Sequence, residues 1–344
     1  MGGGDQTRGD QAGLMNHAAW IRQSVLAALA RDRTPGWSFT GHFQNVAWPR
    51  IDANSMTVTM PVGPQCTDAK GNVELAALLV LFDAALASPT RIALAAGTRM
   101  ATTQLSVQFT AAKVKGAPSV ETVFEGATGD GALRQRLSRA ALSHEGRLVM
   151  TGHGAFVQLP PPPDAGVMAP LPWQRTDLAE PDLLEVNQLD ARESAVLDAC
   201  DAALANASEQ TSFLRHFWGI LPRPVAAGAE CHLRIGPQLA NRVGHVQGGI
   251  LLGIAAETAR VAVPRHSVFS NISAWFLSPG RDAHLECRAS IVHEGRSFAV
   301  IRSEITGAGG VRVFEAMTAH AAPHRHAEVE PMAPVVKTPH VRAD

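Results

Sequence analysis

The sequence predicts an α+β fold made of two similar units in tandem, each an antiparallel sheet wrapped around one central helix. Three observations predict it. The length of 344 residues suits two domains of about 150 residues. A proline-rich stretch lies near the middle of the chain, and the same order of elements stands on either side of it. Two such units can pair edge to edge as an intramolecular pseudo-dimer.

In the first block, strand-like stretches in 39–61 precede an apolar helical run, 73–96. Four alternating segments follow and predict strands at 102–110, 119–126, 132–142 and 147–157. The second block repeats this order with a helix at 249–263 and strands at 269–277, 283–293, 297–306 and 311–319. One helix followed by a run of antiparallel strands describes each unit.

The chain divides into five parts. A polar, glycine-rich start and a short helix from about Leu14 to Ala30 occupy 1–35, with 1–13 expected to be disordered. The remaining parts are the first domain (36–158), a proline-rich linker (159–187), the second domain with a leading helix (188–321) and a disordered tail (322–344).

The tetrapeptide His-Glu-Gly-Arg occurs twice, beginning at His144 and at His293. Aligning Leu105 to Phe109 with Ile272 to Phe276 sets the two blocks in register and puts the tetrapeptides at different positions of the repeat. Both are therefore expected to be hairpin turns, with no role in chemistry.

Composition narrows the classes of function. With a formal net charge of -1, no overall field favours nucleic acid or an anionic membrane surface. The four cysteines form no C-x-x-C pair, so we expect reduced, buried thiols and no zinc site. No apolar signal region and no run of about 18 apolar residues is present, which favours a cytoplasmic protein.

The most informative stretch runs from Asn241 through His245 and Gln247 to Gly248 and Gly249, where polar residues lead directly into an apolar helix. The free N–H groups at such a helix start, together with the helix dipole, can stabilise a developing oxyanion, as acyl transfer requires.

This pattern resembles the hotdog-fold acyl-CoA thioesterases of the PaaI-like group. Their motif is Asn-x-x-Gly-x-x-His-Gly-Gly, then a helix with an acidic residue, then a strand of the type Ala-Thr-x-x-Leu-Ser-x-x-Phe. The resemblance covers roughly 38–158 and 210–321. It implies two hotdog domains in tandem, with each active site built between domains.

The two blocks depart from the family motif in complementary ways. The second block keeps the glycine-rich helix start, with Gln247 for the usual histidine, but has Ala256 at the carboxylate position and Phe269 at the hydroxyl position. The first block has lost the glycines, since Glu74 and Leu75 stand there, yet it keeps Asp83 and Thr102. The resemblance thus implies one complete composite site and one broken site.

In the complete site, Asp83 would activate a water or attack the thioester, and the Gly248 N–H would polarise the carbonyl. Thr102 would hold the water, while Gln247 and Asn241 would bind the substrate or shape the loop. Further substrate-binding candidates are Gly249, His245 and Thr103.

Structural explanations compete for these residues. Asp83 can be a surface acid paired with Arg91, Asn241 and Gln247 can be helix caps, the glycines can serve packing, and Thr102 can be an ordinary strand residue. Glu257 follows the carboxylate position by one residue, so a one-residue shift in register would restore the second site.

The predicted function is therefore hydrolysis of an acyl-CoA to free acid and CoA, with no metal and no cofactor beyond the CoA of the substrate. A non-catalytic acyl-CoA sensor and an acyl-thioester hydratase are the alternatives; the hydratase motifs known to us do not occur. The acyl chain, the choice between CoA and a carrier protein, and pairing of tandem units into a homodimer stay open.

Overall fold

The structure is a computed structural model, and it describes residues 6–92, 94–95, 98–110, 112–129, 134–159, 168–175 and 179–323. Within these residues, twelve strands form one antiparallel sheet in the order β1-β2-β4-β5-β6-β3-β9-β12-β11-β10-β8-β7. Each half of this order belongs to one half of the chain. The predicted α+β fold of two tandem hotdog domains is confirmed.

The first domain carries two helices and six strands in its described part. They are α2 (Phe39–Phe43), β1 (Ala47–Ile51), β2 (Ser55–Thr59), α3 (Leu75–Ala87), β3 (Arg99–Phe109), β4 (Ser119–Thr128), β5 (Gln135–His144) and β6 (Arg147–Leu159). A short 3-10 turn, Pro89–Arg91, follows α3.

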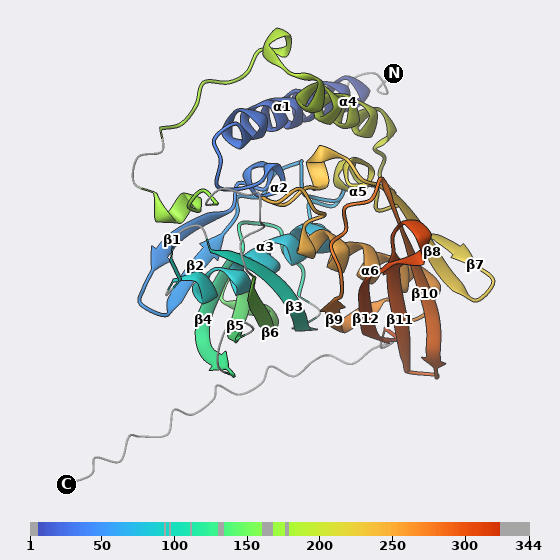
Figure 1. The fold of residues 1–344 in the computed structure, drawn as a ribbon. Coiled ribbons are helices and arrows are strands. Elements are labelled where there is room, and N and C mark those ends of the chain that lie inside the picture. The colour runs from blue at the N-terminus through green and yellow to red at the C-terminus, as the bar shows by residue number, and fades with distance from the viewer. Residues whose placement is uncertain are drawn as a thin grey trace.

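The second domain repeats this order behind a leading helix. Its described elements are α4 (Ala191–Asn206), α5 (Phe213–Phe217), β7 (Arg223–Val225), β8 (Gly228–Arg234), α6 (Gly248–Ala262), β9 (Val268–Phe276), β10 (His284–Glu294), β11 (Phe298–Thr306) and β12 (Arg312–Ala321). Figure 1 shows α3 and α6 side by side against the sheet, with each half of the sheet curving around its own helix.

The two domains are joined through their central strands. β3 pairs antiparallel with β9, with Ser106 opposite Ser273, and the hydroxyl oxygens of these two serines lie 3.1 Å apart. An antiparallel pairing of equivalent strands is what two-fold pseudosymmetry requires. The sheet therefore continues across the domain boundary.

The helices α3 and α6 cross in contact at the centre of the molecule. Both are apolar, and α3 is buried along nearly its whole length because it lies between its own sheet and α6. A methyl group at Gly249 would lie 2.4 Å from the Cα of Val80, so only glycine permits this close approach. This contact fixes the start of α6 beside the C-terminal half of α3.

A second layer of helices covers one end of the sheet. In Figure 1, α1 (Gln6–Asp32) and α4 lie together above α2 and α5. The phenyl rings of Phe39, Phe43, Phe213 and Phe217 pack against one another between the domains. The first helix and α4 are joined by ion pairs, among them Arg22 with Asp201.

Several predicted boundaries were wrong for local reasons. The predicted strand region at 39–61 begins instead with α2, whose phenylalanines are buried between the domains. The helix predicted for 73–96 ends at Ala87, since Pro89 opens a 3-10 turn. The first helix begins at Gln6, although 1–13 was expected to be disordered.

Other predictions agree with the structure or lie outside the described part. The tetrapeptides at His144 and His293 fall at the β5–β6 and β10–β11 turns, as predicted. All four cysteines are buried and free. Of the expected disordered tail only residues 322 and 323 are described, and of the linker 160–167 and 176–178 are not. No helix in the described residues is long and apolar enough to cross a membrane.

Replacing Gly249 by alanine is expected to destabilise the fold by at least about 2 kcal/mol, because the new methyl group meets the α3 backbone, which cannot move aside alone. Gly248→Ala is the matched control on the same helix, since its methyl group would meet a carboxylate and a ring edge rather than backbone. Urea unfolding of both variants measures the difference. Equal losses would show that the helix crossing does not depend on Gly249.

Candidate active site

A cavity of about 470 Å³ lies at the junction of the two domains. Its walls come from α3, the first residues of β3, the loop before α6 and the end of β9. Seven of the eight predicted site residues line it, namely Asp83, Thr102, Thr103, Asn241, His245, Gln247 and Gly248. Residues far apart in the sequence are thus brought to one cavity.

Gln247 links the start of α6 to Asp83. It is the N-cap of α6, and its Oε1 accepts a hydrogen bond of 3.0 Å from the Ile250 N–H. Its Nε2 donates a hydrogen bond of 2.8 Å to Asp83 Oδ2. Because the capping bond uses the amide oxygen of Gln247, the amide nitrogen faces Asp83 and donates the hydrogen bond across the domain boundary.

Asp83 is buried, with 7% of its surface exposed. Thr102 Oγ1 donates to its Oδ1 at 3.5 Å. Burial raises the pKa of Asp83 to about 6, and hydrogen bonds from the Gly249 N–H, Thr102 and Gln247, with the charge of Arg91, oppose the shift. A carboxylate with this pKa changes its charge close to neutral pH, as a general base does.

Gly248 stands directly opposite this carboxylate. A methyl group at Gly248 would lie 2.9 Å from Asp83 Oδ2. As the first residue of α6, Gly248 has an N–H that no intrahelical carbonyl accepts, and no acceptor for it occurs among the described residues. Such an N–H, at the positive end of a helix, can bind a carbonyl oxygen that gains negative charge.

The loop before α6 is held by Asn241. Its Oδ1 accepts hydrogen bonds from the N–H groups of Val243 (3.0 Å) and His245 (3.1 Å), and Gly244 adopts a φ of +81°. The loop before α3 is built in the same way around Asp68, with Gly71 at a φ of +74°. Asn241 therefore shapes the loop through its Oδ1.

These matching loops settle the register of the repeat. Glu74 and Gln247 are both N-caps, with nearly identical backbone angles. Asp83 and Ala256 then stand at the same distance from their N-caps, and Glu257 stands one residue further on. A one-residue shift is ruled out, so Glu257 does not take the place of the family carboxylate.

Different contacts occupy the pseudosymmetric counterparts of Asp83 and Thr102. Glu257 is buried and forms ion pairs with Arg215 at 3.4 Å and Arg260 at 2.9 Å. The ring of Phe269, opposite Thr102 in the repeat, packs against Phe109. Burial raises the pKa of Glu74, which lies near Glu257. This position holds an ion-pair network in place of a cleft carboxylate.

The three predicted substrate-binding residues have different surroundings. Thr103 Oγ1 donates to the Ala155 carbonyl at 2.9 Å, so its hydroxyl is used within the sheet. His245 lines the cavity, and burial, with Arg99 and Arg281 nearby, lowers the pKa of its imidazole. Gly249 lies outside the described lining, because its Cα packs on α3.

Sequence reasoning missed several residues of the lining. Arg91 and Arg242 approach the cavity from different domains, and Met168, Leu171 and Trp173 of the predicted linker cover part of it. Arg91 was considered only as an ion-pair partner of Asp83, and its position within the helix predicted for 73–96 could have placed both on one face. No signal in the sequence indicated that the linker would pack here.

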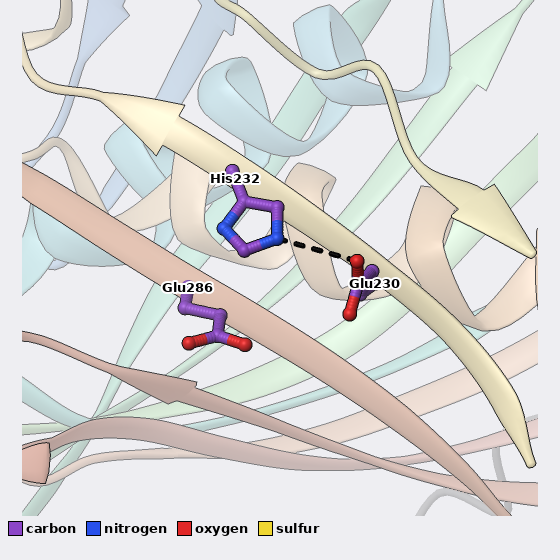
Figure 2. Close-up of side chains that lie close together, drawn as sticks. All are labelled: Glu230, His232 and Glu286. Carbon is purple, nitrogen blue, oxygen red and sulfur yellow. Dashed lines mark hydrogen bonds and ion pairs between the residues drawn. The ribbon is translucent and has the colours of Figure 1, made fainter. Parts of the chain in front are cut away.

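A surface cluster of possible metal ligands lies away from this cavity. Figure 2 shows Glu230 and His232 on β8 beside Glu286 on β10, and their ligand atoms all lie within 4.8 Å of one another. Glu230 is paired with Arg223, and Glu286 with Arg288 at 2.7 Å. The arginines already supply positive charge to both carboxylates, so the cluster is an ion-pair network on the sheet surface.

Comparisons with known proteins agree with this fold. Residues 237–322 match the model of the family described as the acyl-CoA thioesterase N-terminal domain, which supports the predicted enzyme class, a thioester hydrolase. No curated protein matches the chain. The family match is confined to the second domain.

Three solved structures illustrate the similarity. A Bacillus halodurans protein solved with CoA is 21% identical, with 41% of this chain and all of that chain covered and a TM-score of 0.38. An acyl-CoA thioesterase II from Mycobacterium marinum is 12% identical (83% and 97% covered, TM-score 0.43). A 12:0-ACP thioesterase from Umbellularia californica is 10% identical (78% and 94% covered, TM-score 0.49). At these scores the likenesses carry no argument about substrate.

Asp83→Asn is expected to stabilise the protein at pH 8 by about 1–3 kcal/mol, because it removes a buried ionised carboxylate. The pKa of Asp83 is about 6 in the folded chain and 3.8 ordinarily, so the folded chain holds this proton more tightly. The contribution of Asp83 to the free energy of unfolding of the wild type is therefore greatest below pH 4. It is lost as the pH rises through 6.

Urea unfolding of wild type and Asp83→Asn between pH 4 and 8 measures this effect, with Asp182→Asn at an exposed position as the control. The advantage of Asp83→Asn should shrink toward pH 4. A constant difference across this range would contradict the shifted pKa.

Proposed function

We propose that this protein hydrolyses acyl-CoA thioesters to free acid and CoA at one composite site between its two domains. The observation that carries the proposal is the hydrogen bond of 2.8 Å between Gln247 Nε2 and Asp83 Oδ2, which joins a buried carboxylate to the helix start of the other domain. The family match in the second domain supports the same reaction class.

Each side chain has a distinct role in the proposed reaction. The thioester carbonyl accepts a hydrogen bond from the Gly248 N–H and becomes an oxyanion when it is attacked. Asp83, ionised, either removes a proton from the attacking water or attacks the carbonyl carbon itself. In the first route the C–S bond breaks and the sulfur leaves as CoA thiol with the proton that Asp83 took from the water. In the second route the CoA thiolate leaves first, and water then hydrolyses the acyl–Asp83 anhydride, so that one proton of this water goes to the thiolate and the free acid is released.

The remaining residues hold these groups in place. Gln247 orients the Asp83 carboxylate, and Thr102, bonded to the other carboxylate oxygen, holds the water. Asn241 keeps the loop in the shape that presents Gly248. The proposed reaction uses no metal and no cofactor beyond the CoA of the substrate. Membership of the PaaI-like group, a cytoplasmic location and a homodimer of tandem units stay predictions.

Asp83→Asn is expected to lower kcat by at least about 10³-fold while it leaves acyl-CoA binding largely intact, because the amide keeps the shape but supplies no base or nucleophile. Release of free thiol from a panel of acyl-CoAs measures the rate. Binding of acyl-CoA by wild type without thiol release would favour the sensor, and addition of water to an enoyl-CoA would favour the hydratase.

The pH profile follows from the pKa of Asp83. Since the ionised form is the active one, kcat/KM should rise tenfold per pH unit below about pH 6 and level off above it. Initial rates between pH 4.5 and 8 give this profile. A plateau that extends down to pH 4.5 would remove Asp83 from the base and nucleophile roles.

A further inference from the structure

The cavity carries an excess of positive charge on its walls. Arg91, Arg99 and Arg242 line it, whereas Asp83 is the one carboxylate among its described lining residues. The hydrogen bonds of Asp83 go to Gln247 and Thr102, and neither is a cation. Three guanidinium groups around one carboxylate leave the lining with a net positive charge, which favours an anionic ligand.

Arg91 and Arg242 lie close together although they belong to different domains. Both also line a small recess beside Leu171. Arg91 Nη1 donates to the Thr98 carbonyl at 3.2 Å, and Arg242 Nη2 donates to the Ala169 carbonyl. Within the described part of the chain, no carboxylate lies within ion-pair distance of either guanidinium.

The charge of Arg242 reaches Arg91 and acts on its protonation. Burial, followed by the charge of Arg242, lowers the pKa of Arg91 to about 10. Burial also lowers the pKa of Arg242. The charge of Asp83 offsets part of the repulsion at Arg91, but holding two partly buried cations together still costs free energy, which a bound anion would offset.

The cavity has an exposed rim beside Arg242. Val243, next to Arg242, is 39% exposed, and Gly244 is exposed as well. Other residues of the lining, Gly41, Val46 and Ala84, are buried. A strongly hydrated anion fits the exposed rim, where it stays near water, whereas an acyl chain fits the buried part.

We propose that Arg91 and Arg242 form a subsite for the phosphate groups of CoA, so that CoA thioesters are preferred over thioesters of pantetheine without a nucleotide. The inference rests on the proposed hydrolysis and deepens it by naming the residues that bind the phosphates of CoA. Guanidinium forks match phosphate oxygens with paired N–H donors, and each arginine has donors beyond those bonded to backbone carbonyls. Arg99 and His245 flank this subsite.

The test measures KM for acyl-CoA and for the same acyl group on pantetheine. It uses wild type, Arg91→Gln, Arg242→Gln, Arg91→Lys and Arg242→Lys. Each glutamine variant should raise KM for acyl-CoA about tenfold or more, as expected for loss of one charge-assisted contact, and leave KM for acyl-pantetheine unchanged. The lysine variants should recover part of the loss. Arg288→Gln, on the outer surface of β10, is the matched control.

Binding measurements keep the test independent of turnover. Calorimetry with adenosine 3′,5′-bisphosphate should show binding to wild type that weakens in both glutamine variants, and dephospho-CoA then separates the 3′-phosphate from the pyrophosphate. If wild type releases no thiol but binds the bisphosphate through these arginines, the hydrolysis proposal fails and the phosphate subsite stands.

Two results would overturn the subsite. In the first, the glutamine variants lose activity equally on acyl-CoA and acyl-pantetheine, which would mean that the arginines support the fold or the reaction centre. In the second, the loss appears only with acyl groups that carry a carboxylate, which would make these arginines part of an acyl pocket for dicarboxylic substrates.

Discussion

The arrangement of the cavity depends on one close contact, the crossing of α3 and α6 at Gly249 and Val80. The crossing is antiparallel, so it brings the amino-terminal tip of α6 to the level of Asp83 on α3. Gln247 then joins two separate requirements, because one end of its amide caps the helix and the other end binds the carboxylate. A side chain larger than hydrogen at Gly249 would move the helix tip away from Asp83.

The tandem arrangement of two domains in one chain allows the two pseudosymmetric positions to differ. A homodimer must carry the same residues at both of its equivalent sites, whereas a tandem chain can change each copy separately. Here one position keeps the carboxylate and the glycine helix start. The other holds Glu257 in ion pairs with Arg215 and Arg260, and Phe269 against Phe109. The ion pairs there lie within the second domain, whereas the ring contact joins the two domains.

Much of the fold could be predicted from local patterns. The strands were found because their residues alternate between buried and exposed, and α6 was placed within one residue because glycines stand directly before its apolar run. The strand at Gly228–Arg234 was missed, as was the helix at Phe39–Phe43, whose phenylalanines are buried by contacts from the other domain. Periodicity within a segment carries no information on such distant partners.

The lack of information on distant partners also explains which parts of the site could be predicted and which could not. The meeting of Asp83 with Gly248 followed from the resemblance to the hotdog thioesterases, in which one subunit supplies the helix start and the other the carboxylate. The pairing of Arg91 with Arg242, and the packing of Leu171 beside them, depend on how a loop and a linker return to the cavity. Linker composition predicted an extended chain but not the surface on which it lies.

The central claim is that a carboxylate from the first domain and a helix tip from the second act on one carbonyl. A crystal structure with a non-hydrolysable acyl-CoA analogue tests it most directly. One analogue should bind per chain, with its carbonyl oxygen about 3 Å from the Gly248 nitrogen and Asp83 facing the carbonyl carbon. An analogue whose carbonyl lies away from Gly248, or a second one bound beside Glu257, would contradict the account.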